Sequence, residues 1–194
     1  MKRIGSAAAF LASLLASCAT PAPAPAPFEH LDVAGSAIRT APPLAFTVSG
    51  FRAAAPSHRR ADFGGHPYEV SLAALLGTRE AVMVHAERVA DASGASDYDD
   101  LPRTGWPTPA FGLRSACVAV DSATVAAEHD LAWLRDRGWD PAGTVAMDQY
   151  LATTPDHNRE VVISLLVRGI DCADQPAVRA ALDSLRNRIA VRNR

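Results

Sequence analysis

The sequence predicts an α+β domain in which an antiparallel sheet carries helices packed on one face. Apolar residues alternate along several short segments, and two of these segments flank a six-residue turn. Two further segments carry apolar residues at helical spacing. From residue 81 onward the predicted order is β-β-α-β-β-α. Hairpin strands pair antiparallel and each helix has one apolar stripe to bury, so the simplest solution is one sheet with both helices on the same side.

The first half of the chain gives the weaker signals. Residues 28–43 have little periodicity and are predicted to be an irregular lead-in. Residues 44–51 alternate apolar and polar side chains, which predicts a strand. Residues 53–67 contain two prolines and a Gly-Gly pair and are predicted to be a loop. Residues 68–76 fit a short helix as well as a strand.

The middle of the chain predicts two strands on either side of a long loop. In residues 81–89, Val82 and Val84 share one face, whereas His85 and Glu87 lie on the other. The second strand covers residues 113–120. The intervening DASGASDYDDLPRTGWPTP is too rich in Gly, Pro and Asp for a regular element, and long loops inside compact domains are often functional.

Two helices and a hairpin complete the prediction. The first helix is capped by Asp121 or Ser122 and runs to Arg137, with Gly138 as its stop. Residues 144–152 and 160–168 form the hairpin around the turn TTPDHN. Asp174 caps the last helix, whose apolar face is the clearest in the chain and consists of Val178, Ala181, Leu182, Leu185 and Ile189.

The amino terminus carries the features of a secretory signal. Lys2 and Arg3 precede a short apolar segment of about a dozen residues, too short to span a bilayer. Leu15-Ala16-Ser17-Cys18 resembles the lipobox of bacterial lipoproteins. The resemblance implies that residues 1–17 are removed and that Cys18 carries a diacylglycerol and an acyl chain such as palmitate. An anchor with two or three acyl chains makes membrane attachment lasting.

The residues after Cys18 refine the expected location. Ala19 stands where an Asp often retains lipoproteins in the inner membrane, so the resemblance favours the outer membrane. Residues 21–27 alternate Pro with Ala and favour an extended polyproline II tether. The predicted organisation is a signal peptide (1–17), a lipidated Cys with its tether (18–27) and one domain (28–194) that faces the periplasm.

The charge of the mature chain excludes one class of partner. Once the signal peptide is removed, 17 basic residues, all Arg, stand against 21 acidic residues, a net charge of −4. Nucleic-acid binding requires a basic footprint, which is missing here. The absence of Lys after residue 2 also excludes Schiff-base and Ser–Lys chemistry.

Lipidation of Cys18 leaves two thiols, Cys117 and Cys172. An oxidising periplasm favours pairing of an even remainder, and one Cys lies in the strand 113–120 while the other lies just past the hairpin. We therefore expect a disulfide between them, provided that the two strands are neighbours. The alternative is two separate buried thiols that pack as small apolar residues.

Candidate sites are few, and no catalytic motif, metal-ligand spacing or cofactor motif is present. His85 and Glu87 share a strand face and could serve as a metal-binding or proton-transfer pair, although a solvated polar face explains them as well. Around Tyr98, three acidic residues, Asp97, Asp99 and Asp100, lack the pattern of a calcium loop. Trp106 either tucks back onto the domain or serves as a contact residue.

These observations favour a non-enzymatic binding or structural module of the cell envelope. It would contact the membrane through its lipid, and an envelope protein or cell-wall partner through the loop that contains Trp106. No cofactor or metal is expected. The alternative is an envelope hydrolase or a small-ligand carrier with its site around His85 and Glu87.

Overall fold

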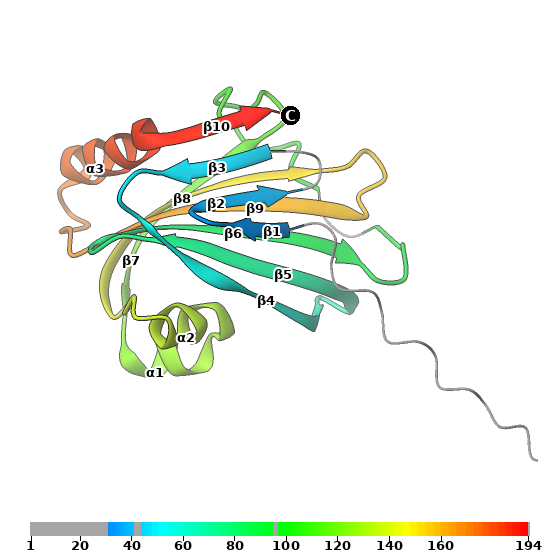
Figure 1. Cartoon of the computed structure of the whole chain (residues 1–194), viewed down its shortest axis with the longest axis horizontal. Coiled ribbons are helices and arrows are strands. Elements are labelled where there is room, and N and C mark those ends of the chain that lie inside the picture. Colours follow the sequence, from blue (N-terminus) through cyan, green and yellow to red (C-terminus); the bar gives the residue numbers. More distant parts are fainter. Residues whose placement is uncertain (1–30, 41–43, 95–96, 194) are drawn as a thin grey trace, which may run out of the picture.

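The computed structural model describes residues 31–40, 44–94 and 97–193. The predicted signal peptide, Cys18 and the Pro/Ala tether lie outside these residues. The described chain forms two antiparallel sheets, one of six strands and one of four, and the smaller lies in front of the larger in Figure 1.

The large sheet has the strand order β4-β5-β6-β9-β8-β7. Its strands are β4 (Arg52–Phe63), β5 (His66–Leu76), β6 (Glu80–Val89), β7 (Gly112–Val120), β8 (Gly143–Thr153) and β9 (Arg159–Arg168). All neighbours pair antiparallel, so β4-β5-β6 and β7-β8-β9 are two meanders joined where β6 pairs with β9. This pairing places strands from both halves of the chain at the centre of the sheet.

The small sheet has the order β1-β2-β3-β10 and covers one face of the large sheet together with a helix. Its strands are β1 (Leu31–Ala34), β2 (Ala37–Thr40), β3 (Leu44–Val48) and β10 (Ile189–Asn193), and the helix is α3 (Gln175–Arg188). The main core lies between these layers and includes Ile38, Phe46, Ile163 and Leu182, all of which are at most 1% exposed.

The opposite face of the large sheet is partly covered by two short helices, α1 (Ser122–Ala127) and α2 (His129–Asp136). Here a second core forms around Trp133, Leu134 and Trp139, which pack against sheet residues such as Leu72 and Met83. Since these helices are short, they bury only one end of this face.

The predicted α+β fold with helices on one face is wrong. Strands hold 52% of the described residues and helices 18%, and a second sheet takes the place expected of a helical layer. The helices also lie on both faces of the large sheet, with α3 on one side and α1 and α2 on the other. The fold is therefore mainly β.

Two missed strand regions account for this error. The predicted irregular lead-in contains the hairpin β1-β2, whose four-residue strands are too short to show periodicity. The predicted loop 53–67 is mostly β4, an edge strand that is largely exposed and so lacks an apolar alternation. Pro56 lies at the bulge between Ala54 and Ser57, where an edge strand tolerates a missing N–H.

Other expected elements are present. The strands 44–51, 81–89 and 113–120, the hairpin and the last helix all appear within a few residues of their predicted bounds. Residues 68–76, which fitted either type, belong to β5. The helix predicted from Asp121 is two helices, since the backbone of Glu128 is extended.

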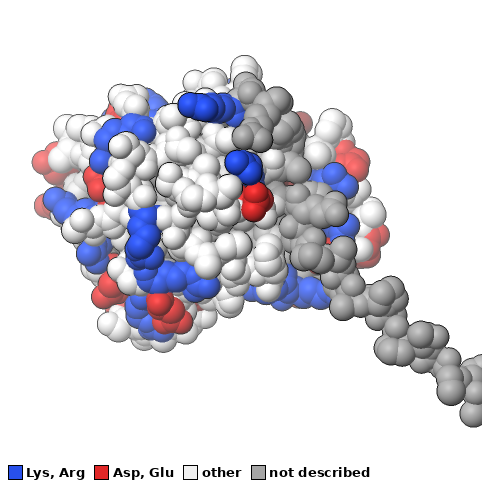
Figure 2. Space-filling model, in the orientation of Figure 1, with Lys and Arg blue, Asp and Glu red and all other residues white. Residues whose placement is uncertain are grey.

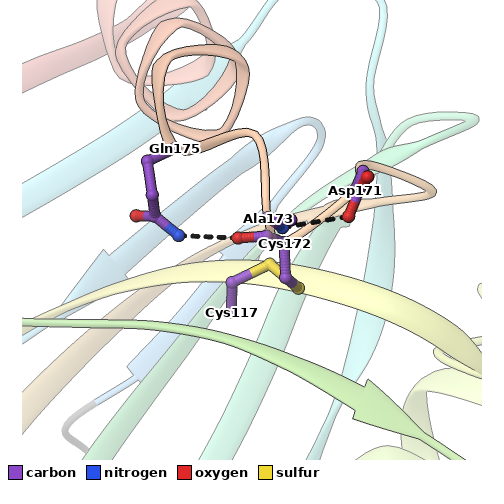
Figure 3. The surroundings of a disulfide bond; sticks show 5 residues. All are labelled: Cys117, Asp171, Cys172, Ala173 and Gln175. Carbon is purple, nitrogen blue, oxygen red and sulfur yellow. Dashed lines mark hydrogen bonds between the residues drawn. A yellow bond between two sulfur atoms is a disulfide. The ribbon is translucent and has the colours of Figure 1, made fainter.

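The predicted disulfide is present. Sγ of Cys117 on β7 lies 2.06 Å from Sγ of Cys172, in the turn before α3 (Figure 3). Around this turn, the side chain of Gln175 donates to the carbonyl of Cys172 at 2.7 Å, and the side chain of Asp171 accepts from the N–H of Ala173 at 2.9 Å. β7 and β9 are not neighbours, as β8 lies between them, so the bridge crosses over β8 to the turn.

The surface in front of the small sheet is largely uncharged. Figure 2 shows acidic and basic side chains gathered along the left side of this view, around α3, and lower left, around α1 and α2. Among the helices of the described chain, none has the length and apolar character needed to cross a membrane.

Candidate functional site

The half of the large sheet that α1 and α2 leave open forms a polar groove of about 290 Å³. Strand alternation brings His85 and Glu87 of β6 onto this face. The groove is lined by residues from all six strands of the large sheet, α2 and the loop before β7: Phe63, Tyr68, His85, Glu87, Tyr98, Arg114, Asp130, Gln149, Leu151, Glu160 and Val162. Below, this set is called the groove.

His85 lies between two carboxylates at the floor of the groove. Its Nδ1 lies 2.9 Å from Oε1 of Glu87, and its Nε2 lies 3.7 Å from Oδ2 of Asp130. Asp130, in the first turn of α2, also pairs with Arg59 of β4 at 3.2 Å. These four side chains therefore form a continuous line of alternating charge that connects the sheet to the helix.

The surroundings raise the pKa of His85 above its ordinary value. Burial alone would lower this pKa because it penalises the imidazolium. The hydrogen bond to Glu87 and the charges of Asp130 and Glu87 outweigh burial and favour the charged ring. In the charged ring both nitrogens carry a proton, so neither has a lone pair with which to accept another.

The two carboxylates respond in the opposite direction. Burial would raise the pKa of Glu87, but the hydrogen bond and charge of His85 outweigh it, and the net pKa is lowered. Burial likewise opposes ionisation of Asp130, and the charge of His85, the hydrogen bond of His129 and the charge of Arg59 lower its pKa. Each ionised group thus stabilises the charged form of its neighbour.

A third carboxyl group extends this network along the neighbouring strand. Glu160 of β9 is directly paired with Glu87 in the sheet register, and hydrogen bonding to Glu160 adds to the lowering of the pKa of Glu87. The hydroxyl of Tyr98 donates to Oε2 of Glu160 at 2.7 Å, which ties the loop before β7 to the groove.

Gly112 makes this approach of the loop feasible. It lies on β7 opposite Leu151, on the groove face of the sheet. A Cβ atom at this position would lie 2.6 Å from Cβ of Leu101 and 3.4 Å from the carbonyl of Tyr98. The absence of a side chain therefore lets the loop lie against the sheet, where Tyr98 reaches Glu160.

The prediction that His85 and Glu87 share a face is confirmed, and their setting differs from a solvated surface. His85 is 9% exposed and Glu87 is 7% exposed. Apolar neighbours on adjacent strands, Leu72 and Val162, flank His85 in the same row of the sheet. The pair is a buried charge pair at the edge of an open groove.

The acidic residues of the candidate contact loop remain at the surface. Asp97, Asp99 and Asp100 are exposed. The side chain of Asp97 accepts from the N–H of Asp99 at 2.9 Å, and Asp99 pairs with Arg103 at 2.9 Å. These contacts hold the loop's own turn, and a role in binding a partner stays a prediction.

Trp106 packs back toward the domain. Its ring is half-buried and meets the ring of Tyr150 edge-on, with centroids 4.4 Å apart. This contact lies on the face covered by α3 and the small sheet, away from the groove. The loop therefore supplies one aromatic residue to the main core and another, Tyr98, to the groove.

Several groove residues were missed from sequence. Arg59 and Phe63 lie on β4, in a segment whose Pro and Gly content predicts a loop. Asp130 lies beside the apolar stripe of its helix and carries no motif. Glu160 had a usable signal, because alternation along its strand places it on the same face as Val162.

Within the described residues, no group of three or more His, Cys, Asp or Glu side chains is arranged to hold a metal ion. No family model, no curated protein and no solved structure matches this chain.

Proposed function

We propose that this chain is a lipid-anchored envelope protein that binds a small polar ligand in the groove. The observation that carries the proposal is the line Glu87–His85–Asp130–Arg59 at the floor of an open pocket, buried at Glu87 and His85 and half-buried at Asp130 and Arg59. Buried charges are costly, and clusters of them at a pocket are more common at functional sites than elsewhere.

The size and lining of the groove suit a small ligand. Its volume of about 290 Å³ lies near the lower end of small-molecule sites. Tyr68 and Phe63 form an aromatic wall, with ring centroids 5.3 Å apart. Aromatic walls with a few placed polar groups are typical of ligand pockets, where they provide contact area and orientation respectively.

Binding is favoured over general-base catalysis by the state of His85. A general base needs a free lone pair near neutral pH. Both nitrogens of His85 face carboxylates, and its pKa is raised, so the imidazolium persists to higher pH than in a free histidine. Glu87 is likewise engaged by His85 and Glu160. These groups are suited to fixing charge rather than to moving protons.

The proposed cellular location rests on features of the amino-terminal sequence. The apolar segment, the sequence Leu15-Ala16-Ser17-Cys18 and the Pro/Ala tether support attachment to the outer membrane through lipid on Cys18, with the domain in the periplasm. The disulfide of the folded domain is consistent with an oxidising compartment.

The binding proposal is tested by NMR titration of the disulfide-bonded domain, residues 28–194, after its fold has been checked by amide dispersion. The probes are phenylacetate, phenylacetamide, phenethylamine and N-acetylglucosamine. We expect at least one probe to shift the backbone amides of residues 85, 87 and 160, while those of β3 stay unchanged. If no probe shifts groove amides, or if shifts spread evenly over the surface, the proposal is overturned.

The alternative of a hydrolase centred on His85 and Glu87 makes a different prediction. Ester hydrolysis, measured with p-nitrophenyl acetate, would then exceed the buffer rate and fall to it in His85→Gln. We expect the wild-type domain and this variant to hydrolyse the ester equally slowly. A rate that depends on His85 would favour the hydrolase.

A further inference from the structure

The charges of the groove are unevenly matched. Glu87, His85, Asp130 and Arg59 pair with one another, so two anions are balanced by two cations. These four groups therefore need no charged ligand for neutrality. Glu160 accepts a hydrogen bond from the hydroxyl of Tyr98 at 2.7 Å.

Arg114 is the exception. It projects from β7 on the groove face, in the row of the sheet that contains Gln149 of β8. Across the described part of the chain, its guanidinium makes neither a hydrogen bond nor an ion pair, and the residue is exposed. Gln149 cannot balance this charge, and its amide donates to Ser164 at 3.3 Å. Arg114 is therefore a positive charge of the groove whose hydrogen-bond donors are available to a ligand.

The part of the groove formed by β4 has an exposed apolar side chain. Phe63, at the end of β4, is 45% exposed, although it lines the groove. Part of the Phe63 ring is already in contact with the protein, because it meets Tyr68 edge-on and the guanidinium of Arg59 lies 5.7 Å from its centroid. An apolar group in the groove would cover the rest of the ring and gain hydrophobic and ring-stacking contacts.

We propose that the ligand is a small organic acid, with its carboxylate on Arg114 and its apolar or aromatic body against Phe63. This inference rests on the proposed function of the groove. A guanidinium binds a carboxylate through two parallel hydrogen bonds, which also fixes its orientation. The carboxylates at the floor repel a second negative charge, so a monoanion fits better than a dianion.

Matched probes test the charge and the apolar body separately. Phenylacetate and phenylacetamide have the same shape and differ in charge, phenethylamine reverses the charge, and acetate lacks the ring. We expect phenylacetate to bind at least 10-fold more tightly than the amide or the amine in NMR titrations of the domain. Acetate should bind at least 10-fold more weakly than phenylacetate.

Two variants and a control assign these preferences to residues. Arg114→Gln should remove the preference for phenylacetate and leave binding of the amide unchanged. Phe63→Ala should weaken the binding of phenylacetate and leave the binding of acetate unchanged. Arg192→Gln is the control, since Arg192 is an exposed residue of β10, outside the groove, and loses the same charge. It should bind phenylacetate like the wild type.

The possible failures are distinguishable. If the amide or the amine binds in the groove as tightly as phenylacetate, or if Arg114→Gln leaves the affinity for phenylacetate unchanged, the organic-acid inference is wrong while the groove remains a ligand site. If none of the probes shifts the groove amides, both proposals are overturned. Amide dispersion of each variant shows whether a lost affinity reflects a lost fold.

Discussion

Nε2 of His85 lies 3.7 Å from Oδ2 of Asp130, and this contact joins the central strand β6 to the first turn of α2. On its other side His85 hydrogen-bonds to Glu87 of the same strand, so one imidazole ring links β6 to a helix. The contact lies at the boundary between the buried and open halves of the sheet face. Stability and ligand access consequently depend on the same side chains.

The first prediction concerns pH. The raised pKa of His85 means that its contribution to the free energy of unfolding is complete below its ordinary value of 6.5 and is lost as pH rises through its folded value. Glu87 and Asp130 have lowered pKa values, so their contribution is complete above 4.5 and is lost as pH falls through their folded values. We expect urea unfolding to show that stability declines from pH 5.5 to pH 8.5.

The variant His85→Gln checks the origin of this decline. It removes the titrating ring, so the difference between pH 5.5 and pH 8.5 should become smaller than in the wild type. Glu87→Gln breaks the buried pair from the other side and should cost about 3–5 kcal/mol at pH 5.5, since it leaves a buried charge without its partner. An unchanged pH difference in His85→Gln would contradict the assignment.

The disulfide should contribute substantially to stability. It closes a loop over a sequence separation of 55 residues, which corresponds to about 4 kcal/mol in the chain-entropy account. We expect Cys117→Ala with Cys172→Ala to lower the free energy of unfolding by about that amount. Reduced wild-type protein is the control and should unfold like the double variant. Two alkylatable thiols in the non-reduced folded domain would contradict the bridge.

Trp106→Ala should lower the melting temperature. Loss of a half-buried ring that packs on Tyr150 should cost about 2 kcal/mol, or about 4–8 °C for a domain of this size. Trp106→Phe keeps an aromatic ring there and should lose less. A melting temperature within about 2 °C of the wild type for Trp106→Ala would instead indicate a ring that is free to contact a partner.

Gly112→Ala should lift the loop from the groove. Its new Cβ atom would lie 2.6 Å from Cβ of Leu101, so the loop has to shift, at a cost of about 1–3 kcal/mol. We expect the amides of residues 97–104 to shift in NMR spectra and proteolysis in this loop to become faster. Tyr98→Phe removes only the hydrogen bond to Glu160 and should leave proteolysis nearly unchanged. Equal proteolysis of Gly112→Ala and wild type would contradict this account.

Cys18→Ala tests the anchor. We expect this variant to lose labelling by a clickable palmitate analogue and to leave the membrane fraction, because the lipid is the proposed attachment. Arg192→Gln in the full chain is a suitable control and should remain labelled. Unchanged labelling of Cys18→Ala would end the lipoprotein interpretation.

The elements that could be predicted from the sequence are those in which the spacing of apolar residues shows which face is buried. Strand β9 alternates around Ile163 and helix α3 carries a continuous apolar stripe, and both were predicted. Strand β4 could not be predicted in this way, because an edge strand with a single buried residue has no apolar period. Without β4 there is no reason to expect a second layer, so the fold class was wrong.

The candidate site was predictable only in part, for a related reason. His85 and Glu87 lie on one strand, and their shared face follows from alternation alone. Asp130 and Arg59 reach His85 through tertiary packing of α2 and β4, which leaves no mark on sequence spacing. Tyr98 reaches Glu160 because residue 112 is a glycine, a dependence that becomes visible only when the loop and the sheet are seen together.

The strand order of the small sheet constrains when the domain can finish folding. β10, the last strand to be synthesised, pairs with β3, near the beginning of the domain, so this sheet spans nearly the whole described sequence. A chain that emerges amino end first, from the ribosome or through an export channel, holds β1, β2 and β3 without that partner until residues 189–193 arrive. The large sheet has all of its strands by residue 168, so it can assemble earlier. Until then, the face of the large sheet that the small sheet later covers would be exposed. A chaperone that binds apolar surface could bind this face during that time.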